Sequence, residues 1–227
     1  MTFTRYAIYY APPAEAEWSR FGASWLGWDM AAGRSLPQPE GTGLELSAIT
    51  EVPRKYGLHA TLKPPMRLAE GQTQSGLEAA CAELAATQTP VSLDGLHLAR
   101  LGRFLALRPT GDEAALNSLA AACVTELDRF RAPPTQAELD RRRGAGLSPE
   151  QDENLTLWGY PFVLEQFRFH ITLTGKLPKP DLPAVEAALE ERLIPLLPAP
   201  LIIRDIVLAG EGPDGRFHLI HRYALSG

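Results

Sequence analysis

The order apolar, His, apolar, Thr, Leu occurs twice in the chain, at residues 58–62 and again at 169–173. Side chains two residues apart on a β-strand point to the same face of the sheet. If both segments are strands, each places an imidazole beside a hydroxyl, while Ala60 or Ile171 packs on the opposite face. Two such strands facing one another would form a site with two histidines and two hydroxyls.

Hydrophobic spacing predicts a regular series of elements around the first copy. In chain order these are a strand at 4–11, a helix at 14–26, a long loop at 33–53, the first His strand, a helix at 74–87, a hairpin of strands at 90–98 and 103–108, and a helix at 112–131. In the first strand, Tyr6, Ile8 and Tyr10 share one face. Pro64 and Pro65 are expected to end the first His strand, because proline cannot donate to a neighbouring strand.

Residues 132–165 interrupt this order. Two prolines, a charged segment at 138–143 and a Ser148-Pro149 helix start predict two short helices that project from the core. The arginines at 141–143 could form a phosphate-binding patch, but the acids beside them favour a solvated face. Beyond the second His strand, a helix at 181–196 and strands at 201–209 and 216–225 repeat the order of the first half.

The two halves of the sequence look like an internal duplication. The motif histidines are 111 residues apart, and two Gly-Arg-Phe segments, beginning at Gly102 and Gly215, are 113 apart. The predicted fold is therefore α+β, bilobal and internally duplicated, with two antiparallel-rich sheets meeting at a central cleft and helices outside. We expect one domain over 1–227, with motif lobes at about 50–131 and 162–227, the N-terminal strand and helix completing it, and 132–161 as a helical insertion.

Composition and charge narrow the class of protein. The 227 residues are 45% hydrophobic and 22% charged, as in ordinary globular proteins, and suffice for a sizeable core. The net charge of -5 argues against a general electrostatic grip on nucleic acid or anionic membrane, so no stable nucleic-acid complex is expected. We predict no signal peptide and no membrane-spanning run. Cys81 and Cys123 lack metal-type spacing, so reduced packing cysteines of a cytoplasmic protein are expected.

The paired histidines indicate acid–base chemistry. With an ordinary pKa of about 6.5, one imidazole can act as a base and the other as an acid at neutral pH. In-line opening of a phosphodiester uses such a pair, because one group deprotonates the nucleophile while the other protonates the leaving oxygen. His59 and His170 are the predicted catalytic pair, and Thr61 and Thr172 the predicted donors to the non-bridging oxygens.

Three further residues are candidates for substrate binding. Lys63 follows Thr61 on the same face if the alternation continues, and its charge suits phosphate. Arg168 lies two residues before His170, and Tyr6 could offer an aromatic face to a substrate. A solvated strand end explains Lys63 equally well and is the favoured explanation for Arg168. Half-buried packing is the favoured explanation for the tyrosine.

The scheme demands no metal and no cofactor. A zinc site from His218, His221 and one motif histidine is an alternative, but the chain lacks His-Glu-x-x-His and offers hydroxyls where a metal would want a carboxylate. The phosphate-binding patterns Gly-x-x-x-x-Gly-Lys and Gly-x-Gly-x-x-Gly are also missing from the sequence.

Taken together, the motifs resemble those of the two-histidine (2H) phosphoesterase superfamily. The resemblance covers essentially the whole chain, and residues 5–9, 56–63, 158–161 and 167–175 look most like its bacterial branch encoded beside phosphonate-utilisation genes. It implies metal-independent opening of a cyclic phosphate on a nucleotide, an RNA end or a ribose, and a link to phosphonate metabolism. The partner implied is a small phosphorylated substrate, and the active-site residues implied are His59, Thr61, His170 and Thr172.

A second interpretation is a binding module for a phosphorylated metabolite or RNA end that performs no turnover. Two titrating groups speak against it, because binding alone would not need them. The insertion departs from the simplest superfamily members. The sequence leaves open whether it forms a lid, which histidine is the base, and the oligomeric state.

Overall fold

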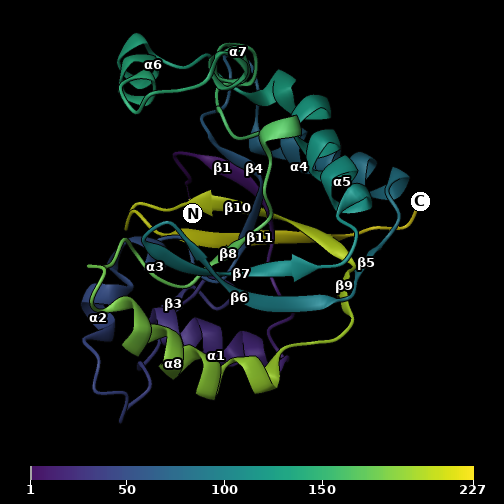
Figure 1. Cartoon of the computed structure of the whole chain (residues 1–227). Helices are drawn as coiled ribbons and strands as arrows, with labels where there is room; N and C mark the ends of the chain where they lie inside the picture. The colour runs from purple at the N-terminus through teal and green to yellow at the C-terminus, as the bar shows by residue number, and fades with distance from the viewer. Residues whose placement is uncertain (1) are drawn as a thin grey trace.

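The computed structural model describes residues 2–227, and its strands gather mainly into two antiparallel sheets (Figure 1). The first sheet has the order β11-β10-β1-β4 and the second β6-β7-β8. Their bounds are β1 (Tyr6–Tyr10), β4 (Ala60–Met66), β6 (Gly95–Leu101), β7 (Phe104–Thr110), β8 (Ile171–Thr172), β10 (Asp205–Glu211) and β11 (Phe217–Ala224). Two short pairs join β2 (Trp28–Asp29) to β3 (Arg34–Ser35) and β5 (Val91–Leu93) to β9 (Leu201–Ile203).

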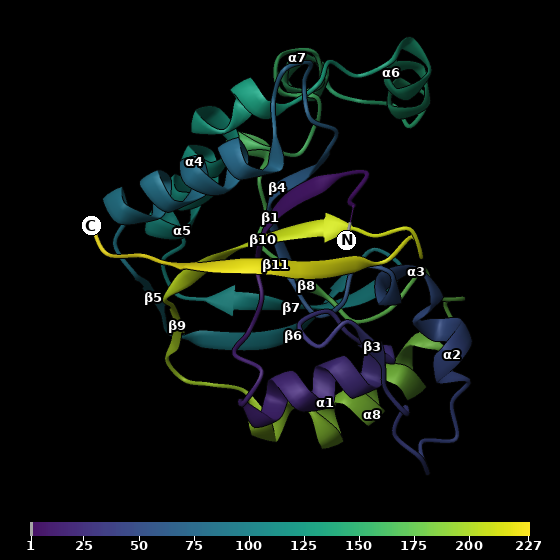
Figure 2. The same ribbon diagram turned by 180° about the vertical axis from the view of Figure 1, so that it is seen from behind.

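Helices cover the outer sides of both sheets. α4 (Gln74–Thr87) and α5 (Ala114–Glu126) lie above the four-stranded sheet in Figure 1, and α1 (Glu17–Leu26) and α8 (Leu182–Arg192) lie below the three-stranded one. The view from behind shows the same arrangement (Figure 2). The predicted α+β class, with two antiparallel sheets and helices outside, is confirmed.

Local sequence accounts for the best predicted helix. α4 has the predicted bounds because Thr73 caps it, with Oγ1 accepting from the N–H of Gly76 at 3.0 Å. Leu77, Cys81 and Leu84 recur at helical spacing and are buried. Cys81 is therefore a packing residue, as expected.

The two sheets do not follow the two halves of the sequence. The first His strand, β4, pairs with the N-terminal β1, which pairs in turn with β10 near the C-terminus. The second His strand, β8, joins β7 from the first half. The halves thus exchange hairpins, unlike the contiguous lobes expected at about 50–131 and 162–227. This exchange brings β4 and β8 together where the sheets meet.

β4 runs through Pro64 and Pro65, which were expected to end it. It forms one edge of its sheet, so an edge proline without an N–H need not remove a bond to a neighbouring strand. The prediction failed because it did not consider that this strand lies at the edge of its sheet.

The segment at 33–53, expected to be mostly loop, holds β3, α2 (Leu46–Ile49) and the start of α3 (Glu51–Arg54). Arg54 fastens it, since its guanidinium donates to the carbonyls of Leu26 at 2.8 Å and Ser47 at 3.0 Å. These contacts are non-local, which is why periodicity did not show them.

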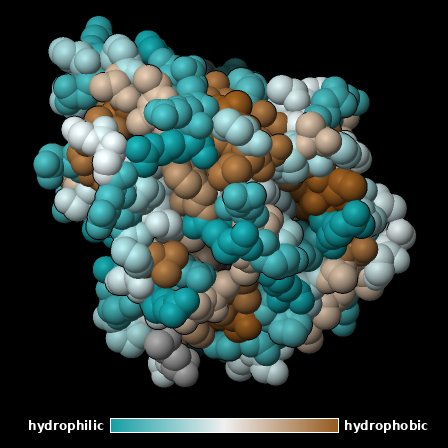
Figure 3. Space-filling view, turned by 90° about the horizontal axis from the view of Figure 1, so that it is seen from below, coloured by the Kyte–Doolittle hydropathy of each residue, from teal (hydrophilic) through white to brown (hydrophobic). Residues whose placement is uncertain are grey.

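The insertion forms the two predicted helices, α6 (Gln136–Arg143) and α7 (Pro149–Trp158), at the top of Figure 1. Each begins with a capping box, from Thr135 to Glu138 and from Ser148 to Gln151. None of the helices within residues 2–227 combines the length and apolar character needed to cross a bilayer. The face seen from below mixes hydrophilic and hydrophobic side chains (Figure 3).

Candidate active site

A cleft of about 430 Å³ opens where β4 and β8 meet. His59, Thr61 and Thr172 line it. Among the described residues, the cations that line the cleft are Arg5, Arg142 and Lys176, and no aspartate or glutamate does so. In a chain of net charge -5, this is a local site suited to an anion.

His59 lies in the turn just before β4, where a hydrogen bond fixes its ring. Its Nδ1 is 2.9 Å from the carbonyl oxygen of Gly57. A carbonyl can only accept, so Nδ1 carries the proton and Nε2 of the neutral ring keeps its lone pair. Oγ1 of Thr61 lies 3.3 Å from that Nε2. The turn needs glycine, because Gly57 has φ +74° and a Cβ there would lie 2.9 Å from Cβ of Met30.

His170 is oriented in the same way just before β8. Its Nδ1 lies 2.7 Å from the carbonyl oxygen of Arg168, again two residues upstream. His170 is not itself among the residues that line the cleft, but its ring centroid is 6.1 Å from that of Phe104, which does line it, and its charge acts on His59. In both motifs Nε2 is therefore the nitrogen that can exchange a proton, and in the first motif it is in contact with the Thr61 hydroxyl.

The environment of His59 keeps it neutral. Its ring centroid lies 3.9 Å from that of Tyr9 and 5.8 Å from that of Tyr56. Removal from water lowers the pKa of His59 to about 4, although the hydrogen bond to Gly57 opposes the shift, and the nearby His170 lowers it further. At neutral pH, His59 is thus available as a base.

The two threonines share the side of the strands that faces the cleft, as the alternation predicts. Thr61 and Thr172 are half-buried, whereas Ala60 and Ile171 between the motif residues are fully buried. Thr174 continues this face, and its Oγ1 accepts from the N–H of Leu105 at 2.9 Å.

Lys63 does not continue the face of Thr61, contrary to the prediction. Pairing with β1 passes from Tyr9 opposite Thr61 to Ile8 opposite Lys63, so β4 takes two steps while β1 takes one. The bulge turns Lys63 to the opposite face of the sheet from Thr61. The alternation of residues from His59 could not predict this bulge, because the bulge depends on the pairing with β1.

On that face Lys63 is a buried structural cation. Its Nζ donates to the carbonyl of Val124 in α5 at 2.8 Å and pairs with Asp128 at 3.2 Å. Burial lowers the pKa of Lys63, and the charge of Asp128 opposes this. The residue joins β4 to α5 and is not among those lining the cleft.

Tyr6 and Arg168 also lie outside the residues that line the cleft. The hydroxyl of Tyr6 donates to Oε1 of Gln74 in α4 at 3.1 Å. The guanidinium of Arg168 donates to the carbonyls of Glu165 at 2.9 Å and Phe167 at 2.6 Å. We therefore assign neither side chain to substrate binding.

His218 and His221 on β11 do not join the motif histidines. Nε2 of His218 lies 3.1 Å from Asp214, and the ring of His221 packs 4.6 Å from that of Tyr223. In the part of the chain that the structure describes, no three His, Cys, Asp or Glu side chains are grouped to hold a metal ion. The alternative zinc site would need residues that the fold keeps apart.

Comparison with known proteins places the chain in a family. Residues 61–218 match the family model described as "Protein of unknown function (DUF1045)". The chain belongs to the DUF1045 family.

Two curated relatives carry the name ribose 1,5-bisphosphate phosphokinase PhnN. The one from Janthinobacterium sp. (strain Marseille) is 37% identical over 221 residues, which cover 94% of this chain and 49% of the relative. The one from Laribacter hongkongensis (strain HLHK9) is 35% identical over 180 residues, 79% of this chain and 42% of the relative. This DUF1045 chain therefore spans about half the length of the curated relatives it matches.

Solved structures with similarity to the DUF1045 chain include E. coli LigT in its apo form, with a TM-score of 0.48, 15% identity and full coverage of both chains. A protein described as a phosphoesterase has a TM-score of 0.47 and 16% identity over 99% of each chain. TT0787 of Thermus thermophilus has a TM-score of 0.46 and 17% identity over 98% of each chain.

Sequence reasoning missed much of the cleft wall of this DUF1045 protein. Lys176 continues the alternation of His170 and Thr172 and could have been found from it. Arg142 belongs to the arginine run for which a phosphate patch was the less favoured interpretation. Tyr160 lies in the segment 158–161 that supports the family resemblance, but the sequence did not place it at the cleft, because only the fold of the insertion brings it there.

Proposed function

We propose that this DUF1045 protein is a phosphodiesterase that opens a cyclic phosphate by acid–base catalysis between His59 and His170. The observation that carries the proposal is the matched pair of imidazoles. Each has Nδ1 bound to the carbonyl two residues upstream, which leaves Nε2 for proton transfer. His59 lines a cleft with cations and no carboxylate among its described lining residues, and His170 lies next to Phe104 in the wall of that cleft.

In the proposed reaction, Nε2 of His59 takes a proton from water, and the oxygen of that water attacks phosphorus. The bond between phosphorus and one ring oxygen breaks, and that oxygen takes a proton from Nε2 of His170. The product is a phosphate monoester with one free hydroxyl. We assign the base to His59 because its surroundings favour the neutral ring.

The threonines and cations stabilise charge on the non-bridging oxygens during this step. Thr61 and Thr172 come from different sheets and offer hydroxyl donors already fixed by the two strands. Lys176 adds positive charge near the second motif. Donors held in place before reaction need little reorganisation as negative charge develops.

Among possible substrates, we propose a ribose cyclic phosphate that carries a second phosphate. The curated relatives are named for a phosphokinase acting on ribose 1,5-bisphosphate. Opening a 1,2-cyclic phosphate of ribose 5-phosphate by breaking the bond to O2 yields that bisphosphate. We do not propose the phosphokinase activity for this chain, because its sequence has no Gly-x-x-x-x-Gly-Lys.

Phosphorus NMR tests the proposal directly. Purified protein is incubated in EDTA with a nucleoside 2′,3′-cyclic phosphate and with the cyclic phosphate of ribose 5-phosphate. We expect the ring resonance to be replaced by that of a monoester with wild type, and no replacement with His59→Ala or His170→Ala. Tight binding with no opening by the wild type would instead support a binding module.

A further inference from the structure

The cleft wall contributed by the insertion holds an arginine without a counter-charge. Arg142 lines both the cleft and an adjoining hollow, where it meets four other arginines: Arg5, Arg67, Arg131 and Arg141. The first three have carboxylate partners in Glu211, Glu138 and Asp128 respectively. In residues 2–227, neither Arg141 nor Arg142 has an ion-pair partner, and of these two only Arg142 reaches the cleft.

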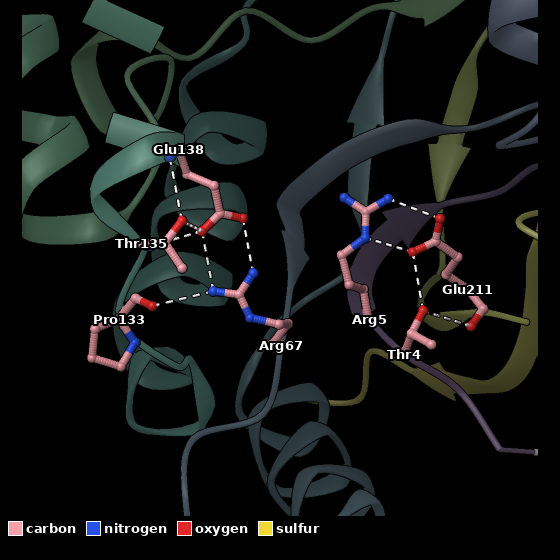
Figure 4. A network of polar contacts seen from close by, with 7 residues as sticks. All are labelled: Thr4, Arg5, Arg67, Pro133, Thr135, Glu138 and Glu211. Carbon is pink, nitrogen blue, oxygen red and sulfur yellow. Dashed lines mark hydrogen bonds and ion pairs between the residues drawn. The ribbon is translucent and has the colours of Figure 1, made fainter. Parts of the chain in front are cut away.

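α6 is fastened at both ends, which holds Arg142 in place. At its first turn, Glu138 accepts from Arg67 at the end of β4, with oxygens 2.8 and 3.1 Å from the two guanidinium nitrogens (Figure 4). At its last turn, Nε of Arg143 lies 2.6 Å from Asp152 of α7. Arg142 lies between these anchors and is half-buried, whereas Arg141 is exposed.

The guanidinium of Arg142 makes a cation–π contact with the ring of Tyr160. Cζ of Arg142 lies 4.6 Å from the centre of the Tyr160 ring, and both residues line the cleft. A guanidinium carries five N–H donors, so one that lies over an aromatic ring still has donors that suit the oxygens of a phosphate.

A second donor in the cleft lacks a partner. Within the described residues, the hydroxyl of Tyr9 is buried and makes no hydrogen bond, and Tyr9 lines the same cleft. Burial raises the pKa of Tyr9 well above its usual value, so the hydroxyl stays protonated as a donor. An unsatisfied buried hydroxyl is costly, and a ligand oxygen would satisfy it.

We propose that Arg142, which lies over the ring of Tyr160, forms with the Tyr9 hydroxyl a second anion subsite that binds a phosphate monoester of the substrate outside the ring that is opened. This inference rests on the proposed function and deepens it. The insertion then selects cyclic phosphates that carry a second phosphate.

A matched pair of substrates tests the subsite. We measure kcat/KM for a nucleoside 2′,3′-cyclic phosphate with a 5′-hydroxyl and for the same compound with a 5′-phosphate, at fixed salt. Wild type should prefer the 5′-phosphate by at least about 10-fold, the usual scale for a hydrogen-bonded charge pair. In Arg142→Gln the ratio should fall toward one, and Arg142→Lys should keep part of it.

Arg141→Gln is the control, because it removes a neighbouring charge from the same helix without touching the cleft. It should keep the wild-type ratio. Equal kcat/KM for both compounds in wild type, or an unchanged ratio in Arg142→Gln, overturns the subsite.

Calorimetric titration with ribose 5-phosphate separates this inference from the proposed function. Wild type and Arg141→Gln should bind it at least about 10-fold more tightly than Arg142→Gln. If the wild type opens neither cyclic compound, the proposed function fails, and this titration alone decides the subsite. Equal affinity of wild type and Arg142→Gln then overturns it.

Discussion

The two His-x-Thr motifs share their local geometry and differ in their surroundings. In both, the ring is held through Nδ1 by the carbonyl two residues upstream. His59 lies near the rings of Tyr9 and Tyr56 at the edge of a four-stranded sheet, while His170 precedes a two-residue strand near Phe104. A motif thus fixes which nitrogen can react, and its neighbours fix when that nitrogen is protonated.

The same contrast appears two residues beyond each threonine. In the second copy Thr174 stays on the cleft face, whereas in the first copy a bulge sends Lys63 into the interior. The duplicated pattern therefore breaks at the first irregularity in strand pairing. The positive charge on the cleft comes instead from Arg5, from Lys176 and from Arg142 of the insertion.

Removing either histidine should have the largest effect. We expect His59→Ala and His170→Ala each to lower kcat by about 100-fold or more, the usual scale for a lost acid or base. The measurement is the rate of ring opening under saturating substrate. His97→Ala, at an exposed position on β6, is the control and should keep the wild-type rate. Near-wild-type rates in either motif variant contradict the assignment.

The two histidines should respond differently to the leaving group. A p-nitrophenolate leaves without a proton, so a p-nitrophenyl phosphodiester should restore much of the rate to His170→Ala and little to His59→Ala. Equal restoration in both variants would remove the assignment of His59 as base and His170 as acid.

Loss of one threonine hydroxyl should have an intermediate effect. We expect Thr61→Val and Thr172→Val each to lower kcat by about 10-fold, less than the roughly 100-fold seen for a lost oxyanion donor elsewhere, because other donors line the cleft. Serine at either position keeps the hydroxyl and should retain most activity. A valine variant as active as its serine counterpart would show that the hydroxyl does not act.

The pH profile tests the environment of His59. A base must be deprotonated, so kcat/KM should fall as the pH drops through about 4, the lowered pKa of His59, and not through its ordinary value. Tyr56→Ala admits water to the ring and should move this acid limb upward by about one pH unit. Tyr56→Phe keeps the ring and should leave the limb in place. If the wild-type activity falls instead at the ordinary pKa of histidine, His59 with its lowered pKa is not the base that limits the reaction.

Lys63→Met should have the smallest effect on turnover. Lys63 lies on the interior face, so kcat/KM should stay within about threefold of wild type. The free energy of unfolding should fall by about 1–3 kcal/mol, because the Val124 carbonyl loses its donor and Asp128 loses one cation. Denaturant titration measures this. A large loss of activity without loss of stability would contradict the structural role and indicate that Lys63 contacts the substrate.

The sequence by itself determined the elements that depend on neighbours along the chain. Hydrophobic spacing and a capping threonine gave α4 its bounds, and proline and serine signals gave the helices of the insertion. Alternation correctly put His59 and Thr61 on a different side from Ala60. These features follow from backbone periodicity, which is read within a few residues.

Only the tertiary structure decided the features that depend on pairing between distant segments. The exchange of hairpins set which strands flank each motif, and the bulge opposite β1 set the direction of Lys63. The lowered pKa of His59 arises from its burial in the folded chain and from the charge of the distant His170, and Arg142 reaches the cleft because Arg67 and Asp152 anchor its helix. Register, burial and charge compensation are sums over non-local contacts, which a local pattern does not contain.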